Sequence, residues 1–184
     1  MEEMMERIHI FGASGSGATS LSRLLAIRLN YRHFDIDDYF WLPTEPPFQK
    51  IREEKERRLL LMRDIESNRR WVISGSLCGW GDAAIPLFDL VVFLYVPKEV
   101  RLRRLRDREI ARFGKTRLDP GGVMHEQHRQ FMNWAAAYDD GGLDSRSLQL
   151  HRQWLRKITC DVLRFEGDQP IERQLKTILT KITD

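Results

Sequence analysis

The stretch Phe11–Ser20, FGASGSGATS, decides the fold of this chain. Just before it, Arg7–Phe11 is a short apolar run of the kind that forms a buried strand. Just after it, leucines recur at three- and four-residue spacing between Leu21 and Leu29, which predicts a helix from Thr19 to about Asn30. The order strand, glycine-rich loop, helix predicts an α/β domain whose loop lies at one end of a strand.

The glycines of this stretch match the spacing of a phosphate-binding loop, G-x-x-x-x-G-K-[ST]. Gly12 and Gly17 occupy the two glycine positions, and Thr19 occupies the hydroxyl position that binds Mg²⁺. In such loops the backbone N–H groups and the helix N-terminus surround a phosphate. We therefore expect a nucleotide-binding loop made of Gly12, Ser14, Gly15, Ser16, Gly17, Ala18, Thr19 and Ser20.

The lysine of the pattern is missing, because position 18 is alanine. A lysine here makes charge-assisted hydrogen bonds with phosphate, each worth about 1.5–3 kcal/mol. Stabilisation of a transferring phosphoryl group also needs cations nearby. Another residue must supply this charge, or the loop binds nucleotide weakly and without catalysis.

Two other interpretations of the loop compete with phosphate binding. The first is a glycine-rich turn without a ligand. The second is a dinucleotide site of a reductase, with Asp35 and Asp37 near the spacing of a ribose-binding acid. Against the reductase, no tyrosine has a lysine four residues later, and the chain is short for that fold. The phosphate loop explains more of the pattern.

A basic segment is the candidate source of the missing charge. Lys98–Arg117 carries nine Lys or Arg against three Asp or Glu, and four of its arginines would form one stripe on a helix: Arg101, Arg104, Arg108 and Arg112. A glycine-rich loop, Gly114–Gly122, follows. Arginine forks match phosphate oxygens, so we predict a small Arg-rich lid at about residues 112–124. A solvated charged face with internal salt bridges is the alternative.

The rest of the chain alternates between strand and helix patterns. Strands are predicted at His33–Asp37, Trp71–Ser74, Leu90–Val96 and Asp161–Phe165, and helices at roughly 50–67, 98–113, 125–138, 145–157 and 170–182. The continuously apolar Leu90–Val96 is typical of a strand buried on both faces in a parallel sheet. This alternation predicts a doubly wound α/β domain.

Composition limits the class of protein. With 184 residues, 42% hydrophobic and 31% charged, the chain suits a single globular domain spanning 1–184. Two cysteines without metal-type spacing, an acidic N-terminus and no long apolar run predict a cytoplasmic protein that does not enter a membrane. The net charge of +3 says little by itself. Nucleic-acid binding through the arginine stripe would need a broader basic surface, so a nucleic-acid partner is not expected. Nothing in the sequence indicates an oligomeric state.

Several stretches together resemble a known group of proteins. These are the loop with its GxxxxG-x-T spacing, HFDIDDYF, WVISGS and the Arg-rich helix with its lid. They are similar to small P-loop kinases of the adenylate kinase and shikimate kinase type. GASGSGATS, FDIDDYFW, SGSLCGWGD and DPGGVMHEQH more narrowly resemble the adenylate-kinase-related P-loop ATPases, a subgroup that also lacks the loop lysine.

The resemblance implies a three-layer P-loop NTPase fold with a five-stranded parallel sheet and the nucleotide at the carboxyl ends of the strands. It implies that Asp35 is the acid associated with Mg²⁺ and Asp37 the acid that contacts the acceptor, with Asp38 beside it. Ser74–Ser76 matches the loop that lines the acceptor site. Arg104 and Arg108 lie near the entry to the lid, and Arg117 lies within it.

Chemistry agrees with this assignment of the acids. Carboxylates at a strand end, facing a phosphate loop, can hold Mg²⁺ and orient or deprotonate a hydroxyl. Capping of a helix is the alternative for Asp35, Asp37 and Asp38, because aspartate is favoured at that position.

The sequence thus predicts an ATP-dependent phosphotransferase that uses Mg²⁺ and a small-molecule acceptor, either a nucleoside or nucleotide or another small metabolite. Thr19 and Asp35 would hold the metal, while the catalytic residues would be Asp37, Asp38, Arg104, Arg108 and Arg117. A catalytically silent nucleotide-binding regulatory module is the second hypothesis, and Ala18 favours it.

Overall fold

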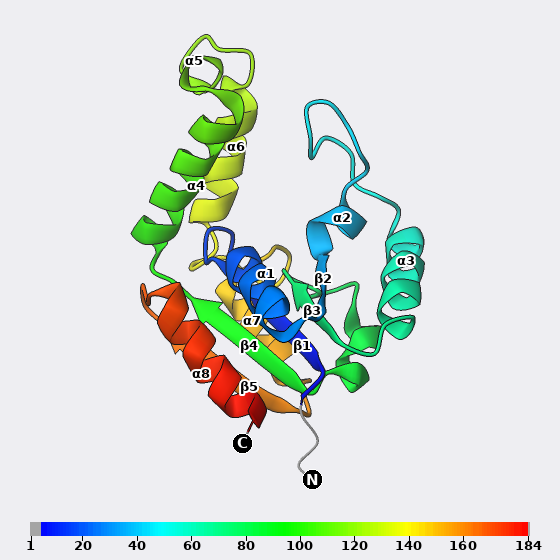
Figure 1. The fold of residues 1–184 in the computed structure, drawn as a ribbon. Helices are drawn as coiled ribbons and strands as arrows, with labels where there is room; N and C mark the ends of the chain where they lie inside the picture. Colours follow the sequence, from blue (N-terminus) through cyan, green and yellow to red (C-terminus); the bar gives the residue numbers. More distant parts are fainter. Residues whose placement is uncertain (1–4, 184) are drawn as a thin grey trace.

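Five parallel strands form a single sheet in the order β2-β3-β1-β4-β5 (Figure 1). The structure is a computed structural model that describes residues 5–183. The strands are β1 Arg7–Gly12, β2 Arg32–Asp35, β3 Trp71–Ser74, β4 Leu90–Tyr95 and β5 Asp161–Glu166. The predicted five-stranded parallel α/β fold is confirmed.

Helices cover both faces of the sheet because successive strand residues point to opposite sides. Ile8 and Ile10 of β1 pack into a core beneath α1 (Ala18–Leu29) and α8 (Ile171–Thr183). Phe11 packs into the other core, with residues of α3 (Glu54–Glu66) and α7 (Leu148–Leu155). Apolar side chains on both faces of β1 therefore produce the three layers.

An arm of three helices extends beyond the carboxyl ends of the strands (Figure 1). It consists of α4 (Lys98–Phe113), α5 (Lys115–Leu118) and α6 (His125–Ala136). The sequence predicted a loop at Gly114–Gly122, but part of it is the helical turn α5. Its Leu118 is buried, and the N–H of Asp119 donates to the carbonyl of Lys115 at 3.0 Å.

Two further elements differ from the sequence prediction. The predicted strand His33–Asp37 ends at Asp35, and the short helix α2 (Ile36–Phe40) begins there. The carboxylate of Asp35 accepts a hydrogen bond from the N–H of Asp37 at 3.2 Å, so the capping acid stops the strand and starts the helix. A 3₁₀ helix, η1 (Asp82–Leu87), was not predicted.

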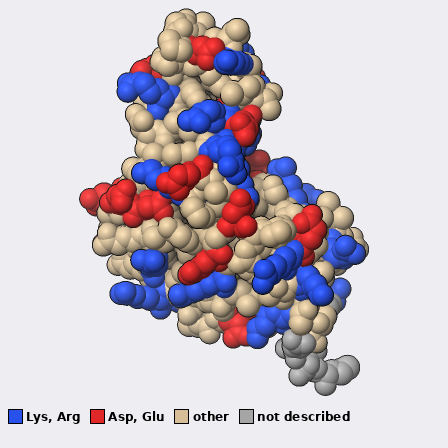
Figure 2. All heavy atoms as spheres, turned by 90° about the vertical axis from the view of Figure 1, so that its left-hand side faces the viewer, with Lys and Arg blue, Asp and Glu red and all other residues tan. Residues whose placement is uncertain are grey.

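The surface carries charges of both signs. On the face shown in Figure 2, Lys and Arg side chains alternate with Asp and Glu, and no broad basic area covers this face. Within residues 5–183, no helix combines the length and the apolar character needed to cross a membrane.

Candidate functional site

The glycine-rich loop lines a cavity of about 240 Å³ at the carboxyl end of β1. Residues from four other parts of the chain complete its wall. The lining residues are 12–20, Asp35, Ile36, Asp37, Gly75, Ser76, Arg104, Leu105, Arg108 and Arg146. Tertiary structure thus brings the predicted phosphate loop, two of the predicted acids and two of the predicted arginines into one site.

Glycine is required at the loop positions where the backbone passes close to neighbours. A Cβ at Gly12 would collide with the carbonyl oxygen of Leu94 on β4. Gly15 has a φ of +82°, and a Cβ there would lie 2.7 Å from the carbonyl oxygen of Arg101. Gly17, with a φ of 94°, is the N-cap of α1. These constraints hold the loop against the N-terminus of α1, where backbone N–H groups favour an anion.

The loop fits a phosphate group in its donor chemistry. The hydroxyl of Ser16 is buried and has no hydrogen-bond partner among residues 5–183. Such an unpaired hydroxyl is costly to bury and is stabilised by a ligand oxygen. Ala18 is buried at the start of α1 and brings no charge, so cations of other elements must compensate for the missing lysine.

Arg104 brings a cation directly to the loop. Its Nη1 lies 3.3 Å from the carbonyl oxygen of Gly15 and 3.4 Å from that of Ser16. Its Nη2 donates to Oδ1 of Asp168, in the turn between β5 and α8, at 2.6 Å. The guanidinium of Arg104 is therefore fixed beside the loop from two sides, close to the end of α1 where the lysine of the pattern is absent.

Two more arginines line the cavity from the arm and from the loop that follows it. Arg108 on α4 lies over the ring of Phe131, with 5.9 Å between its Cζ and the ring centroid. Arg146, in the loop between α6 and α7, lies over the ring of Trp134, with 5.5 Å between its Cζ and the ring centroid. Desolvation lowers the pKa of both guanidinium groups, while the Asp37 carboxylate opposes this shift. Both cations therefore lack full hydration and are near a carboxylate.

Sequence reasoning missed Arg146. It lies in an irregular segment that was predicted to be helical, whereas α7 begins only at Leu148. A single arginine in a loop has no spacing pattern, so only the fold shows that Arg146 lines the cavity.

Asp35 and Asp37 both line the cavity from the turn between β2 and α2. Burial raises the pKa of Asp35, and the nearby Asp37 carboxylate raises it further. Arg23 of α1 approaches Asp35 with 3.6 Å between Nη2 and Oδ2. A desolvated carboxylate beside a second one is stabilised by a cation, and Mg²⁺ usually binds one or two carboxylates together with phosphate oxygens.

The donor set therefore fits Mg²⁺ only in company with a nucleotide. Thr19 and Asp35 both line the cavity, as the sequence predicted for a metal site. Within residues 5–183, no group of three His, Cys, Asp or Glu side chains could hold a metal ion unaided. Phosphate oxygens would have to supply the remaining ligands.

The cavity lining does not include four of the predicted residues: Asp38, Arg101, Arg112 and Arg117. Asp38 is exposed on α2 and does not line it, and Arg117 is exposed on α5 at the tip of the arm. Arg101 is fully buried: its guanidinium pairs with Asp139 and donates to the carbonyl of Val96 at 2.9 Å. The expectation that Arg101 belongs to a phosphate-facing stripe is therefore wrong, because its charge is already neutralised inside the protein.

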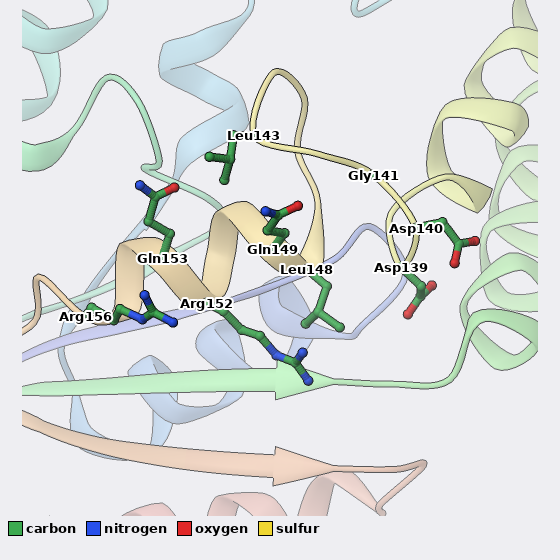
Figure 3. A pocket seen from close by; sticks show the side chains of 9 residues that line it. All are labelled: Asp139, Asp140, Gly141, Leu143, Leu148, Gln149, Arg152, Gln153 and Arg156. Atoms are coloured by element: carbon green, nitrogen blue, oxygen red, sulfur yellow. The ribbon is translucent and has the colours of Figure 1, made fainter.

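A second cavity, of about 480 Å³, lies along α7 and shares no residue with the first. Figure 3 shows glutamine and arginine side chains projecting from α7 and two aspartates at the loop after α6. Its lining residues are Asp139, Asp140, Gly141, Leu143, Leu148, Gln149, Arg152, Gln153 and Arg156. It contains no glycine loop, so the smaller cavity is the candidate active site.

Comparison with known proteins agrees with this geometry. Residues 8–117, which include the glycine loop and the β2–α2 acids, match a family described as AAA domain. The chain belongs to this AAA domain family. The chain is also 44% identical to the uncharacterized protein YqaC of Bacillus subtilis (strain 168). The alignment of 176 residues covers 96% of this chain and 97% of YqaC.

Several solved structures with a similar fold are kinases. A shikimate kinase from Bacteroides thetaiotaomicron matches with a TM-score of 0.58 and 23% identity, covering 98% of this chain and 99% of the other. A shikimate kinase from Acinetobacter baumannii in complex with shikimate has a TM-score of 0.57 and 20% identity, with 98% and 94% covered. A gluconokinase from Sinorhizobium meliloti 1021 has a TM-score of 0.52 and 16% identity, with 99% and 94% covered. The AAA domain protein therefore has a P-loop kinase-like fold.

Proposed function

We propose that this AAA domain protein transfers the terminal phosphoryl group of ATP to a hydroxyl group of a small molecule. One observation carries the proposal: the carboxylate of Asp37 lines the same cavity as the phosphate loop and three arginines. A site that only binds nucleotide needs the loop, whereas transfer also needs a group to accept the hydroxyl proton and cations for the developing charge.

Each residue would have a distinct task. The N–H groups of the loop and the unpaired hydroxyl of Ser16 bind phosphate oxygens. Arg104, held at the loop by Asp168, supplies the charge that Ala18 lacks. Thr19 and Asp35 would hold Mg²⁺, which when bound neutralises phosphate charge.

The acceptor would lie on the opposite side of the cavity, near the β2–α2 turn and the Ser74–Ser76 loop. Asp37 orients the acceptor hydroxyl and accepts its proton. Arg108 and Arg146 lie within electrostatic range of Asp37, so two cations border the place where the acceptor hydroxyl would react. We also propose that the arm, including Arg117 and residues of about 112–124, closes over bound nucleotide and excludes water.

A catalytically silent regulatory module remains the second candidate function, because Ala18 removes a charge that other phosphate loops use. We propose a cytoplasmic location for either function, since Cys78 and Cys160 are both free thiols. The two candidates differ in one measurable respect: only the enzyme releases ADP in response to an acceptor.

The test begins with nucleotide binding. A thermal-shift series with ATP, ADP, GTP and NADPH, with and without Mg²⁺, detects any ligand at saturation, because a concentration of 100 times Kd adds about 2.7 kcal/mol to the unfolding free energy. We expect a Mg²⁺-dependent shift with ATP. A shift with NADPH alone would instead favour a reductase.

ADP release is then measured with an acceptor panel of shikimate, gluconate, glycerol and nucleosides, each of which offers a hydroxyl group. For an active acceptor, D37N should lower kcat by about 10²- to 10⁴-fold while the affinity for ATP stays unchanged. D38N is the matched control, because Asp38 is exposed and lies outside the cavity. Equal losses in D37N and D38N would contradict the role of Asp37, and nucleotide binding without any ADP release would favour the silent module.

A further inference from the structure

Three histidines from different elements contact three consecutive residues, Ser74–Ser76, at the end of β3 and just after it. The Nε2 atom of His33 lies 3.0 Å from Oγ of Ser74, and that of His9 lies 2.8 Å from the carbonyl oxygen of Gly75. The Nε2 atom of His151 lies 3.1 Å from Oγ of Ser76. Gly75 and Ser76 line the candidate active site, so this histidine cluster fixes one wall of the cavity from behind.

Two histidines of the cluster, His9 and His151, lie in surroundings that favour the neutral ring at pH 7. Burial lowers the pKa of His9 to about 4 and that of His151 to about 3. A neutral imidazole has one N–H donor and one bare nitrogen acceptor, so each contact has a direction set by the tautomer. His9 must donate from Nε2, since the carbonyl of Gly75 can only accept.

Tyr138 determines the tautomer of His151. The phenol oxygen lies 2.8 Å from Nδ1 of His151, and both side chains are buried. If Nδ1 carried the hydrogen, Tyr138 would have to accept it. The buried phenol hydrogen of Tyr138 would then have no acceptor among residues 5–183. If Tyr138 donates to Nδ1 instead, every hydrogen of the pair is used, which avoids the cost of an unpaired buried donor.

The tautomer of His151 also sets the direction of its hydrogen bond with Ser76. With Nδ1 occupied as an acceptor, His151 carries its hydrogen on Nε2 and donates it to Oγ of Ser76. The hydroxyl hydrogen of Ser76 is consequently not used by His151. The Ser76 hydroxyl could donate its hydrogen to the thiol of Cys78, which lies within hydrogen-bonding distance. A thiol sulfur is a weak acceptor, however. A ligand oxygen in the cavity would be a better one.

We propose that Ser76 donates a hydrogen bond to a second oxygen of the phosphoryl acceptor, and that His151 and Tyr138 are positioning residues that keep this hydrogen available to the cavity. The inference rests on the proposed phosphotransferase function and narrows its substrate class. With the reacting hydroxyl at Asp37, the acceptor has another hydroxyl or an oxyanion facing Ser76. A polyol or a hydroxy acid fits this site, whereas a simple alcohol leaves the oriented donor without a partner.

The tautomer is tested directly and without any activity. Protein labelled with ¹⁵N-histidine is examined by long-range ¹H–¹⁵N NMR at pH 7, and H151Q, H9Q and H33Q identify the signals. We expect neutral His151 with its hydrogen on Nε2, and loss of this single tautomer in Y138F. A hydrogen on Nδ1 in the wild-type protein would overturn the inference, whatever the protein catalyses.

The specificity is tested with an active acceptor from the panel and its analogue lacking one hydroxyl. Wild-type protein should prefer the complete acceptor in kcat/KM by about tenfold or more, because an unpaired donor in the site penalises the analogue. S76A should lose this preference through a higher KM for the complete acceptor, and S76T should restore it. Y138F should weaken it. The exposed Ser67 at the end of α3 provides the matched control S67A.

Failure of this inference is distinguishable from failure of the proposed function. An unchanged preference in S76A, with normal turnover, would overturn the role of Ser76 and leave the phosphotransferase intact. If wild-type protein turned over no acceptor, the proposed function would fail, and with it the assignment of an acceptor to Ser76. The NMR result would then decide only the hydrogen-bond direction in the cluster.

Discussion

Arg104 is held by Asp168, with 2.6 Å between Nη2 of the arginine and Oδ1 of the aspartate. The two residues lie 64 positions apart and join α4 to the turn between β5 and α8. The bond keeps the guanidinium beside the glycine-rich loop. It also engages Nη2, which could otherwise donate to a phosphate oxygen. If nucleotide binds at the loop as proposed, we expect Asp168 to compete with it for Arg104.

Replacement of Asp168 tests this competition. D168N should tighten the binding of Mg²⁺–ATP by up to about fivefold, because a partly exposed ion pair is worth up to about 1 kcal/mol. Isothermal titration calorimetry measures the change, with E172Q on α8 as a control. Weaker binding in D168N would instead mean that Asp168 orients Arg104 for the nucleotide. In R104A, phosphoryl transfer should fall more than nucleotide affinity, since charge develops mainly during transfer.

Ala18 can be changed into the lysine of the usual pattern. Because Ala18 lines the cavity, the ammonium group in A18K should reach the phosphates and tighten ATP binding by about ten- to a hundredfold, from a charge-assisted bond. A18M has similar length without charge and should not. If A18K binds ATP no better than A18M, the guanidinium of Arg104 already occupies the place of the lysine.

Arg101 should be required for stability. Its buried guanidinium pairs with Asp139, and its Nη1 donates to the carbonyl of Ala135 at 3.2 Å. R101A leaves the carboxylate of Asp139 without its partner and should lower the unfolding free energy by about 3–5 kcal/mol. Urea denaturation measures this loss. R103A, at an exposed position of α4, should change stability by less than about 0.5 kcal/mol. Comparable losses in both variants would contradict the structural role.

The histidine cluster predicts acid sensitivity. The pKa values of His9, His33 and His151 in the folded protein lie below the usual value near 6.5. The unfolded chain therefore binds protons that the folded protein does not. Stability should be complete above about pH 6.5 and should fall below it by up to about 1.4 kcal/mol per pH unit for each neutral histidine.

Urea unfolding at pH 7, 6 and 5 measures this slope. H151Q should show a smaller fall between pH 7 and pH 5 than the wild-type protein, even if it is less stable at every pH. An unfolding free energy that is equal at pH 7 and pH 5 in wild-type protein would contradict the neutral state of the cluster.

Local features of the sequence predicted much of the fold correctly. The apolar runs of β1, β3 and β4 are strands because their residues are buried on both faces, and such runs are recognisable without any partner. The end of β2 was predicted two residues too late. There the capping preference of Asp35 overrode the apolar alternation of the strand.

The arginines show the limit of helical spacing. Arg101, Arg104 and Arg108 follow one periodic pattern on α4, yet Arg101 is buried in an ion pair while the other two line the cavity. Spacing predicts which residues share a face, but the orientation of that face depends on α6 and on Asp139. The same reason separates Asp37, which lines the cavity, from its neighbour Asp38, which does not.

The sequence by itself determined the glycine-rich loop between β1 and α1, because the spacing of its glycines is a local requirement of the backbone. It also determined the parallel α/β sheet through the composition of the strands. Only the tertiary structure decided which cations reach the loop, brought the isolated Arg146 to the cavity, and placed His9, His33 and His151 behind Ser74–Ser76. These contacts join residues far apart in the chain, and no local pattern encodes them.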